Sequence, residues 1–77
     1  MTEKGYEYQV WDTCEGTVEA KDSHGVYLIL DNGEPAYAYS HLNLRSGDRV
    51  FCSVKRKAGQ NRRKLVSIDS TLMFNAA

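Results

Sequence analysis

The sequence predicts a small all-β protein, one closed barrel of five short antiparallel strands with a single helical turn between the third and the fourth. Its 77 residues make one small domain. Apolar and polar residues alternate with a period of two along most of the chain, whereas the spacing typical of helices is weak. Turn-forming residues separate five such runs, and closing the runs into a barrel leaves no exposed strand edge.

The first three strands are expected at residues 13–21, 25–31 and 35–40. Valine, isoleucine, tyrosine and threonine fill these runs, as is typical of strands. Asn32-Gly33 lies between the second and third runs and is a strong hairpin signal, because both residues tolerate positive φ. A two-residue loop there pairs Leu28 with Tyr37. It predicts a core face of Val26, Leu28, Leu30, Tyr37 and Tyr39, and an outer face of Tyr27, Ile29, Ala36 and Ala38.

The last two strands are expected at residues 48–57 and 64–69. Alternation turns Val50, Cys52 and Val54 inward and Phe51 outward, and Val66 and Ile68 are the inward pair of the last strand. Between the third and fourth strands, Ser40 is expected to cap one helical turn. Leu42 and Leu44 would then plug an end of the core.

The domain boundaries follow from these strands: an N-terminal extension at 1–12, the barrel at 13–70 and a tail at 71–77, whose Leu72, Met73 and Phe74 are expected to cover a core edge. The alternation of Tyr6, Tyr8 and Val10 would extend the first strand upstream. Cys14 and Cys52 face inward on neighbouring strands. We expect them to lie close together as reduced thiols.

Charge divides the chain although its net charge is zero. Residues 1–44 carry two basic and eight acidic residues, and residues 45–77 carry eight basic and two acidic ones. Six of the bases lie between positions 55 and 64, without a carboxylate among them. Two interpretations stay open at this point: an anionic partner, or mutual attraction of the two halves within one fold.

Several short motifs, in this order, resemble the S-one RNA-binding domain, the OB-fold repeat of the largest small-subunit ribosomal protein. They are Gly16-Thr17-Val18, the run from His24 to Leu30, the run from Pro35 to Leu42, and Gly47-Asp48-Arg49-Val50. The resemblance covers about residues 16–69 and implies RNA-facing aromatics at His24 and Tyr27. A bulge at Gly25 would bring these two to one face. The family's histidine is replaced by Ala38. Its aspartate and arginine of the last hairpin have no clean equivalents, and Ala58 and Leu65 lie near where they would fall.

These observations predict a module that binds single-stranded RNA or DNA. Aromatic rings stack bases and cations neutralise phosphates. The expected stacking residues are His24, Tyr27 and Phe51, and the expected phosphate contacts are Lys55, Arg56, Lys57, Arg62, Arg63 and Lys64. The alternative is a protein-protein interaction module or a subunit of a larger assembly, which an OB-fold also supports.

Other classes of function find little support in the sequence. No nucleophile-base arrangement or phosphate-binding glycine loop is present, so we expect no enzyme. Cys14, His24, His41 and Cys52 are too widely spread for paired metal ligands, and we expect no metal or cofactor. The longest apolar run, Val26 to Leu30, is too short to cross a membrane. The first 13 residues lack the apolar stretch of a signal peptide, so we expect a cytoplasmic protein. We also expect a monomer.

Overall fold

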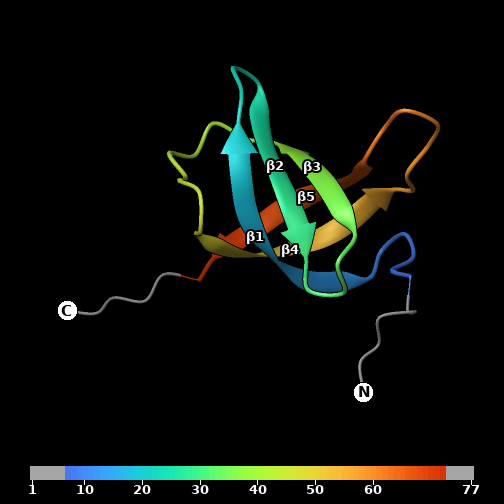
Figure 1. The fold of residues 1–77 in the computed structure, drawn as a ribbon. Coiled ribbons are helices and arrows are strands. Elements are labelled where there is room, and N and C mark those ends of the chain that lie inside the picture. Colours follow the sequence, from blue (N-terminus) through green and yellow to red (C-terminus); the bar gives the residue numbers. More distant parts are fainter. Residues whose placement is uncertain (1–6, 73–77) are drawn as a thin grey trace.

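The computed structural model describes residues 7–72 and shows a closed barrel of five strands in the order β1-β2-β3-β5-β4 (Figure 1). This confirms the predicted fold class. The strands are β1 (Thr13–Lys21), β2 (Gly25–Leu30), β3 (Pro35–Tyr39), β4 (Arg49–Arg56) and β5 (Lys64–Thr71). Tyr6, Met73 and Phe74 lie outside the described residues. No helix within residues 7–72 is long and apolar enough to cross a membrane.

The barrel closes through a parallel seam. β1 pairs antiparallel with β2 and β4, β2 with β3, and β4 with β5. β3 and β5 run parallel and pair Ala36 with Lys64 and Tyr37 with Leu65. The seam is parallel because the chain changes direction between β3 and β4 and again between β4 and β5. β5 therefore runs in the same direction as β3.

The β2–β3 hairpin differs from the prediction by one residue. Leu28 pairs with Ala36 and Tyr27 with Tyr37. The Leu30 N–H donates to the Glu34 carbonyl oxygen at 2.9 Å, so the loop holds three residues, 31–33. Gly33 takes the positive φ of 94°, as is usual in three-residue hairpin loops. The predicted two-residue loop is therefore wrong. Tyr37 and Tyr39 point outward with Tyr27, and Ala36 and Ala38 point inward.

The core consists of small and branched side chains that alternate along the strands, namely Cys14, Val18, Val26, Leu28, Leu30, Ala36, Ala38, Leu44, Val50, Cys52, Val54 and Val66. Leu44 plugs one end as predicted, whereas Leu42 is 51% exposed. The predicted helical turn is absent from the described residues. In its place the Ser40 hydroxyl oxygen accepts a hydrogen bond from the Leu42 N–H at 3.1 Å.

The two cysteines lie directly opposite each other on β1 and β4, as predicted. Cys14 and Cys52 are register partners. Their sulfur atoms are 3.8 Å apart, and both are buried free thiols. That separation exceeds the length of a disulfide bond, about 2.05 Å. The pair therefore packs as two small apolar side chains.

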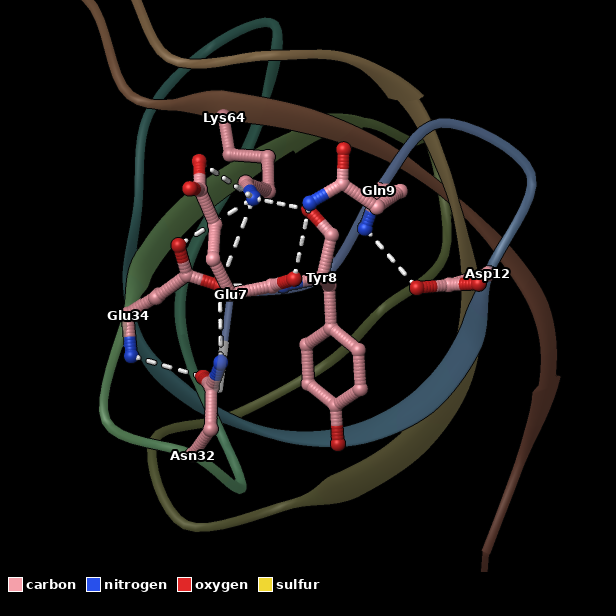
Figure 2. A network of polar contacts seen from close by, with 7 residues as sticks. All are labelled: Glu7, Tyr8, Gln9, Asp12, Asn32, Glu34 and Lys64. Carbon is pink, nitrogen blue, oxygen red and sulfur yellow. Dashed lines mark hydrogen bonds and ion pairs between the residues drawn. The ribbon is translucent and has the colours of Figure 1, made fainter. Parts of the chain in front are cut away.

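A buried lysine ties the segment before β1 to the barrel (Figure 2). Lys64 is fully buried, and its ammonium donates to the Tyr8 carbonyl oxygen at 2.5 Å. It also pairs with Glu34 Oε2 at 3.1 Å. The Tyr8 N–H donates to Glu34 Oε1 at 3.2 Å, which closes the network. A buried ammonium needs such partners, because an unpaired charge is costly in the interior.

Candidate nucleic-acid interface

Three tyrosines gather on the outer face of β2 and β3, and we call Tyr27, Tyr37 and Tyr39 the tyrosine face. The centroids of Tyr27 and Tyr37 are 5.0 Å apart with an interplanar angle of 60°. Those of Tyr37 and Tyr39 are 5.2 Å apart at 86°. Such edge-to-face contacts hold rings in fixed orientations. Tyr39 is 67% exposed, so its ring is the most accessible of the three.

Asp22, in the turn between β1 and β2, fixes two of these rings. Its Oδ1 accepts hydrogen bonds from the Tyr37 hydroxyl and the His24 and Gly25 N–H groups, each at 2.9 Å. Its Oδ2 accepts one from the Tyr27 hydroxyl at 3.1 Å. The sequence interpretation missed Asp22, because its role exists only once β2 and β3 bring the two phenols together.

These hydrogen bonds shift the pKa values of Asp22, Tyr27 and Tyr37. The bond from the His24 N–H and those from Tyr37, Gly25 and Tyr27 together lower the pKa of Asp22 to about 2. Partial burial and the bond to Asp22 raise the pKa of Tyr37 to about 12. The bond to Asp22 also raises the pKa of Tyr27. At neutral pH the carboxylate is therefore ionised, and both phenols keep the protons that they donate to it.

Gly25 makes this arrangement possible, but not through a bulge. Gly25 pairs in register with Tyr39, so the predicted bulge at Gly25 is wrong. A Cβ on Gly25 would lie 2.1 Å from the Ala38 carbonyl oxygen and 2.9 Å from the Tyr37 hydroxyl. The bulge falls instead on β1, between Val18 and Ala20 and opposite Tyr27. Gly25 is therefore needed for the close approach of β3 and of the Tyr37 ring.

Arg63, the residue directly before β5, completes the tyrosine face. Its guanidinium carbon lies 4.9 Å from the centroid of the Tyr27 ring. Its Nη1 donates to Glu19 Oε1 and to the Leu28 carbonyl oxygen, each at 3.4 Å. Glu19 is the residue that the β1 bulge leaves without a register partner. The resemblance placed the family's arginine near Ala58 or Leu65. The structure instead brings Arg63 onto the aromatic surface, where a cation stacks well on a tyrosine ring.

The two other expected stacking residues occupy different places. His24 is exposed in the turn next to Asp22, and its ring has no hydrogen bond or ion pair within residues 7–72. Phe51 is 40% exposed on the outer face of β4. It lies opposite Glu15, whereas Tyr27 lies opposite Ala20, five residues further along β1. Phe51 therefore does not join the tyrosine face.

The six cations of the β4–β5 hairpin lie in different environments. Lys57 and Arg62 are exposed near its tip, and Arg63 lies against Tyr27. Lys55 lies 4.7 Å from the ring centroid of Trp11, and Arg56 is half-buried with its Nε unpartnered among the described residues. Lys64 is buried and occupied by its ion pairs, which corrects its assignment as a phosphate contact.

Trp11 was not predicted as a site residue, although its exposure stands out in the structure. It is 73% exposed and has a φ of 80°, which bulky residues rarely adopt. Its N–H donates to the Val54 carbonyl oxygen at 2.9 Å, and the Val54 N–H donates to the Asp12 carbonyl oxygen at 2.9 Å. The ring is thus presented from a turn that is anchored on β4.

Comparison with known proteins supports the fold. No family profile and no curated protein matches the sequence. One similar solved structure is described as "putative exosome complex RNA-binding protein", with a TM-score of 0.73 and 12% identity over 90% of this chain and 50% of that one. Another is GSP13 from Bacillus subtilis, with a TM-score of 0.60 and 18% identity over 80% of this chain and 55% of that one.

The chain thus spans about half the length of each of these two proteins. At these identities the similarity is one of fold. The order of strands, the closed barrel and these structural neighbours agree with the resemblance seen in the motifs. The chain has the closed five-stranded OB-fold barrel that the sequence predicts.

Proposed function

We propose that this chain binds single-stranded RNA on the tyrosine face. The observation that carries the proposal is the cluster of Tyr27, Tyr37 and Tyr39, ordered by Asp22 and flanked by Arg63. Tyrosine rings on an OB-fold barrel are suitable platforms for unpaired bases. One structural neighbour is described as an RNA-binding protein, which supports RNA as the ligand.

The proposed mechanism combines stacking on exposed rings with charge neutralisation by exposed cations. A base that stacks on an exposed ring contributes about 1–3 kcal/mol, largely independent of sequence. Lys57 and Arg62 are exposed on the neighbouring hairpin, where they supply charge to phosphates without an ion pair of their own in residues 7–72. Each phosphate contact releases counterions, so binding weakens as salt rises. The proposed role is binding, with no chemical step.

Replacement of the most exposed ring tests this proposal. Tyr39→Ala is expected to weaken binding of a mixed-sequence single-stranded RNA by about 5- to 100-fold, the loss of one stacked base. Fluorescence anisotropy at low salt measures it, and a DNA strand of the same sequence tests discrimination. Phe51→Ala is the matched control, since it removes an exposed aromatic elsewhere on the barrel. Equal affinities for wild type, Tyr39→Ala and Phe51→Ala would refute the tyrosine face as the interface.

The turn that presents Trp11 favours a second candidate function, contact with a protein partner. Val10 is 36% and Trp11 73% exposed, and tryptophan is enriched among the residues that dominate protein interfaces. A strained backbone conformation that costs about 1–3 kcal/mol is retained there by hydrogen bonds to β4. A protein that is captured after ribonuclease treatment by wild type and Tyr39→Ala, but not by Trp11→Ala, would support this function. Equal capture by all three would reject it.

A further inference from the structure

The hydroxyl end of the tyrosine face carries acceptors and almost no free donors. A phenol has one proton, and both Tyr27 and Tyr37 donate theirs to Asp22, at 3.1 and 2.9 Å. Their oxygens keep lone pairs that accept hydrogen bonds. The carboxylate of Asp22 is ionised at neutral pH, so it too accepts only.

Two backbone N–H groups of the turn are also occupied. The His24 and Gly25 N–H groups, which would otherwise face a ligand in this turn, both donate to Asp22 Oδ1 at 2.9 Å. Oδ1 thus accepts three hydrogen bonds, whereas Oδ2 accepts one and keeps capacity for another. Asp22 is an exposed residue, and that capacity is open to a ligand.

Arg63 does not alter this balance at the hydroxyl end. Its guanidinium lies over the Tyr27 ring, and its Nη atoms donate to Glu19 and to strand carbonyls. Ser23 and His24 follow Asp22 in the turn and carry side-chain donors, and the Tyr39 hydroxyl is the third phenol of the tyrosine face. All three residues are exposed, and none of these donors is hydrogen-bonded to Asp22 within residues 7–72.

We propose that this acceptor rim, formed by Asp22, Tyr27 and Tyr37, makes the site prefer bases with an exocyclic amino group over uracil. The inference rests on the proposed RNA-binding function. Cytosine and adenine each present an amino donor that Asp22 Oδ2 or a phenolic oxygen accepts. Uracil presents two carbonyl acceptors around one N–H, so at this rim its carbonyls lose water and face oxygens that have no free proton to donate. An unmet polar group of this kind is the strongest source of discrimination between similar ligands.

Homopolymers measure the preference directly. Single strands of about six nucleotides fit one OB-fold barrel. Oligo(C) is expected to bind about tenfold more tightly than oligo(U), the value of one hydrogen bond to a charged acceptor. Oligo(A) should also exceed oligo(U). Binding of both homopolymers with equal affinity, still lost in Tyr39→Ala, would overturn the inference and leave the proposed function standing. Failure of every strand to bind would overturn both.

Two variants that remove the same charge separate hydrogen bonding from electrostatics. Asp22→Asn keeps an acceptor for the His24 and Gly25 N–H groups and places an amide donor where Oδ2 stands. We expect the C-to-U ratio to fall toward one as oligo(U) gains affinity. Glu19→Gln removes a charge on the Arg63 side of Tyr27, and it is expected to change both affinities alike without changing the ratio. An equal effect of Asp22→Asn and Glu19→Gln on the ratio would overturn the inference.

A third variant tests the rim without touching the turn. Tyr27→Phe removes one acceptor oxygen, while the bonds of Asp22 to Tyr37 and to the backbone stay in place. The C-to-U ratio should fall, and amide chemical shifts should show an intact barrel. His24→Ala should leave the ratio unchanged. An unaltered ratio in Tyr27→Phe, or loss of the ratio in His24→Ala, would assign the preference elsewhere.

Discussion

At the scale of a single residue, the missing side chain of Gly25 determines how closely β3 approaches the start of β2. The Ala38 carbonyl oxygen and the Tyr37 hydroxyl occupy the space that a Cβ would need. One of these contacts is with backbone, which cannot move without opening the hairpin. The position therefore couples the packing of β3 to the orientation of Tyr37 on the tyrosine face.

Gly25→Ala is expected to destabilise the fold by about 2 kcal/mol or more, because the new methyl group overlaps the backbone of β3. Urea unfolding measures the change in the free energy of unfolding. Gly59→Ala serves as control. There a Cβ would meet only the Arg62 side chain, at 3.5 Å, and stability should stay within about 0.5 kcal/mol of wild type. Similar stabilities of Gly25→Ala and Gly59→Ala would contradict the close approach.

Lys64 supports a second prediction at this scale. Lys64→Met leaves Glu34 and the Tyr8 carbonyl without their buried partner, and it should cost about 3 kcal/mol at pH 7. Arg62→Met, at an exposed position, should change stability little. Urea unfolding of both variants and wild type gives the comparison. A Lys64→Met protein as stable as Arg62→Met would contradict the buried ion pair.

The same pair gives stability a pH dependence with a definite sign. Burial raises the pKa of Glu34, but hydrogen bonds from Asn32, Tyr8 and Lys64 outweigh it and lower the pKa below 4.5. The contribution of Glu34 is therefore complete above pH 4.5 and is lost as pH falls through the lowered folded-state pKa. The stability difference between wild type and Lys64→Met should shrink over that range. A difference independent of pH would show that the charge of Glu34 plays no part.

At the scale of elements, the β4–β5 hairpin divides its cations between structure and surface. Lys64 is buried, Lys55 lies against Trp11, and Arg62 is exposed near the tip. The loop of residues 40–48 lies on the opposite side of the barrel and carries Arg45, another exposed arginine (Figure 1). Arg62 and Arg45 therefore place an exposed positive charge on two opposite sides of the barrel.

Arg62→Ala is expected to reduce the slope of log K against log salt by about 0.7 if Arg62 contacts one phosphate of a single strand. Binding should weaken for all sequences alike, since phosphates carry no sequence information. Arg45→Ala should leave the slope unchanged. RNA titrations at several salt concentrations provide the slopes. The same reduction in both variants would mean that only the net charge of the protein matters.

The sequence predicts the elements well and their register less well. Alternation placed all five strands within a few residues, because each strand has one buried face. The three-residue loop 31–33 was not predicted, because Asn32-Gly33 suits loops of two or three residues. In the longer loop Asn32 Nδ2 donates to Glu34 Oε1, and the Glu34 N–H donates to Asn32 Oδ1. That single-residue shift moved Tyr37 and Tyr39 from the expected core to the candidate site.

The sequence pattern alone could not predict the roles of site residues that depend on tertiary contacts. Asp22 acquires its role from phenols on two strands, and Lys64 is buried because its partners come from residues 8 and 34. Arg63 was included as a generic cation, yet its position over Tyr27 requires the parallel alignment of β3 and β5. Charge and alternation identify candidate residues, whereas the fold determines which of them meet.

At the scale of the whole molecule, the parallel seam between β3 and β5 is the strand pair with the fewest paired residues. β3 and β5 pair through Ala36–Lys64 and Tyr37–Leu65, whereas β1 pairs along most of its length with β2 and β4. Local opening begins where few interactions must break together. The seam is therefore expected to open before the rest of the sheet.

Hydrogen exchange should resolve this order. Peptides that cover β3 and the start of β5 are expected to exchange sooner than peptides from the middle of β1. Lys64→Met should accelerate exchange at the seam more than in β1. Uniform exchange across all strands would instead indicate that the barrel opens as one cooperative unit.

The hydrogen bond from the Lys64 ammonium to the Tyr8 carbonyl oxygen also bears on the order in which the fold forms during synthesis. The two residues are 56 positions apart, so the Tyr8 carbonyl oxygen can accept this hydrogen bond only after the start of β5 has been synthesised. The β1–β2 and β2–β3 hairpins need only neighbouring sequence and can form earlier. Contacts between such distant residues slow folding, because a long loop must close before they form. The tyrosine face is therefore assembled from hairpins that form early. Arg63 and the hydrogen bond between Lys64 and Tyr8 are added only when β5 has been synthesised.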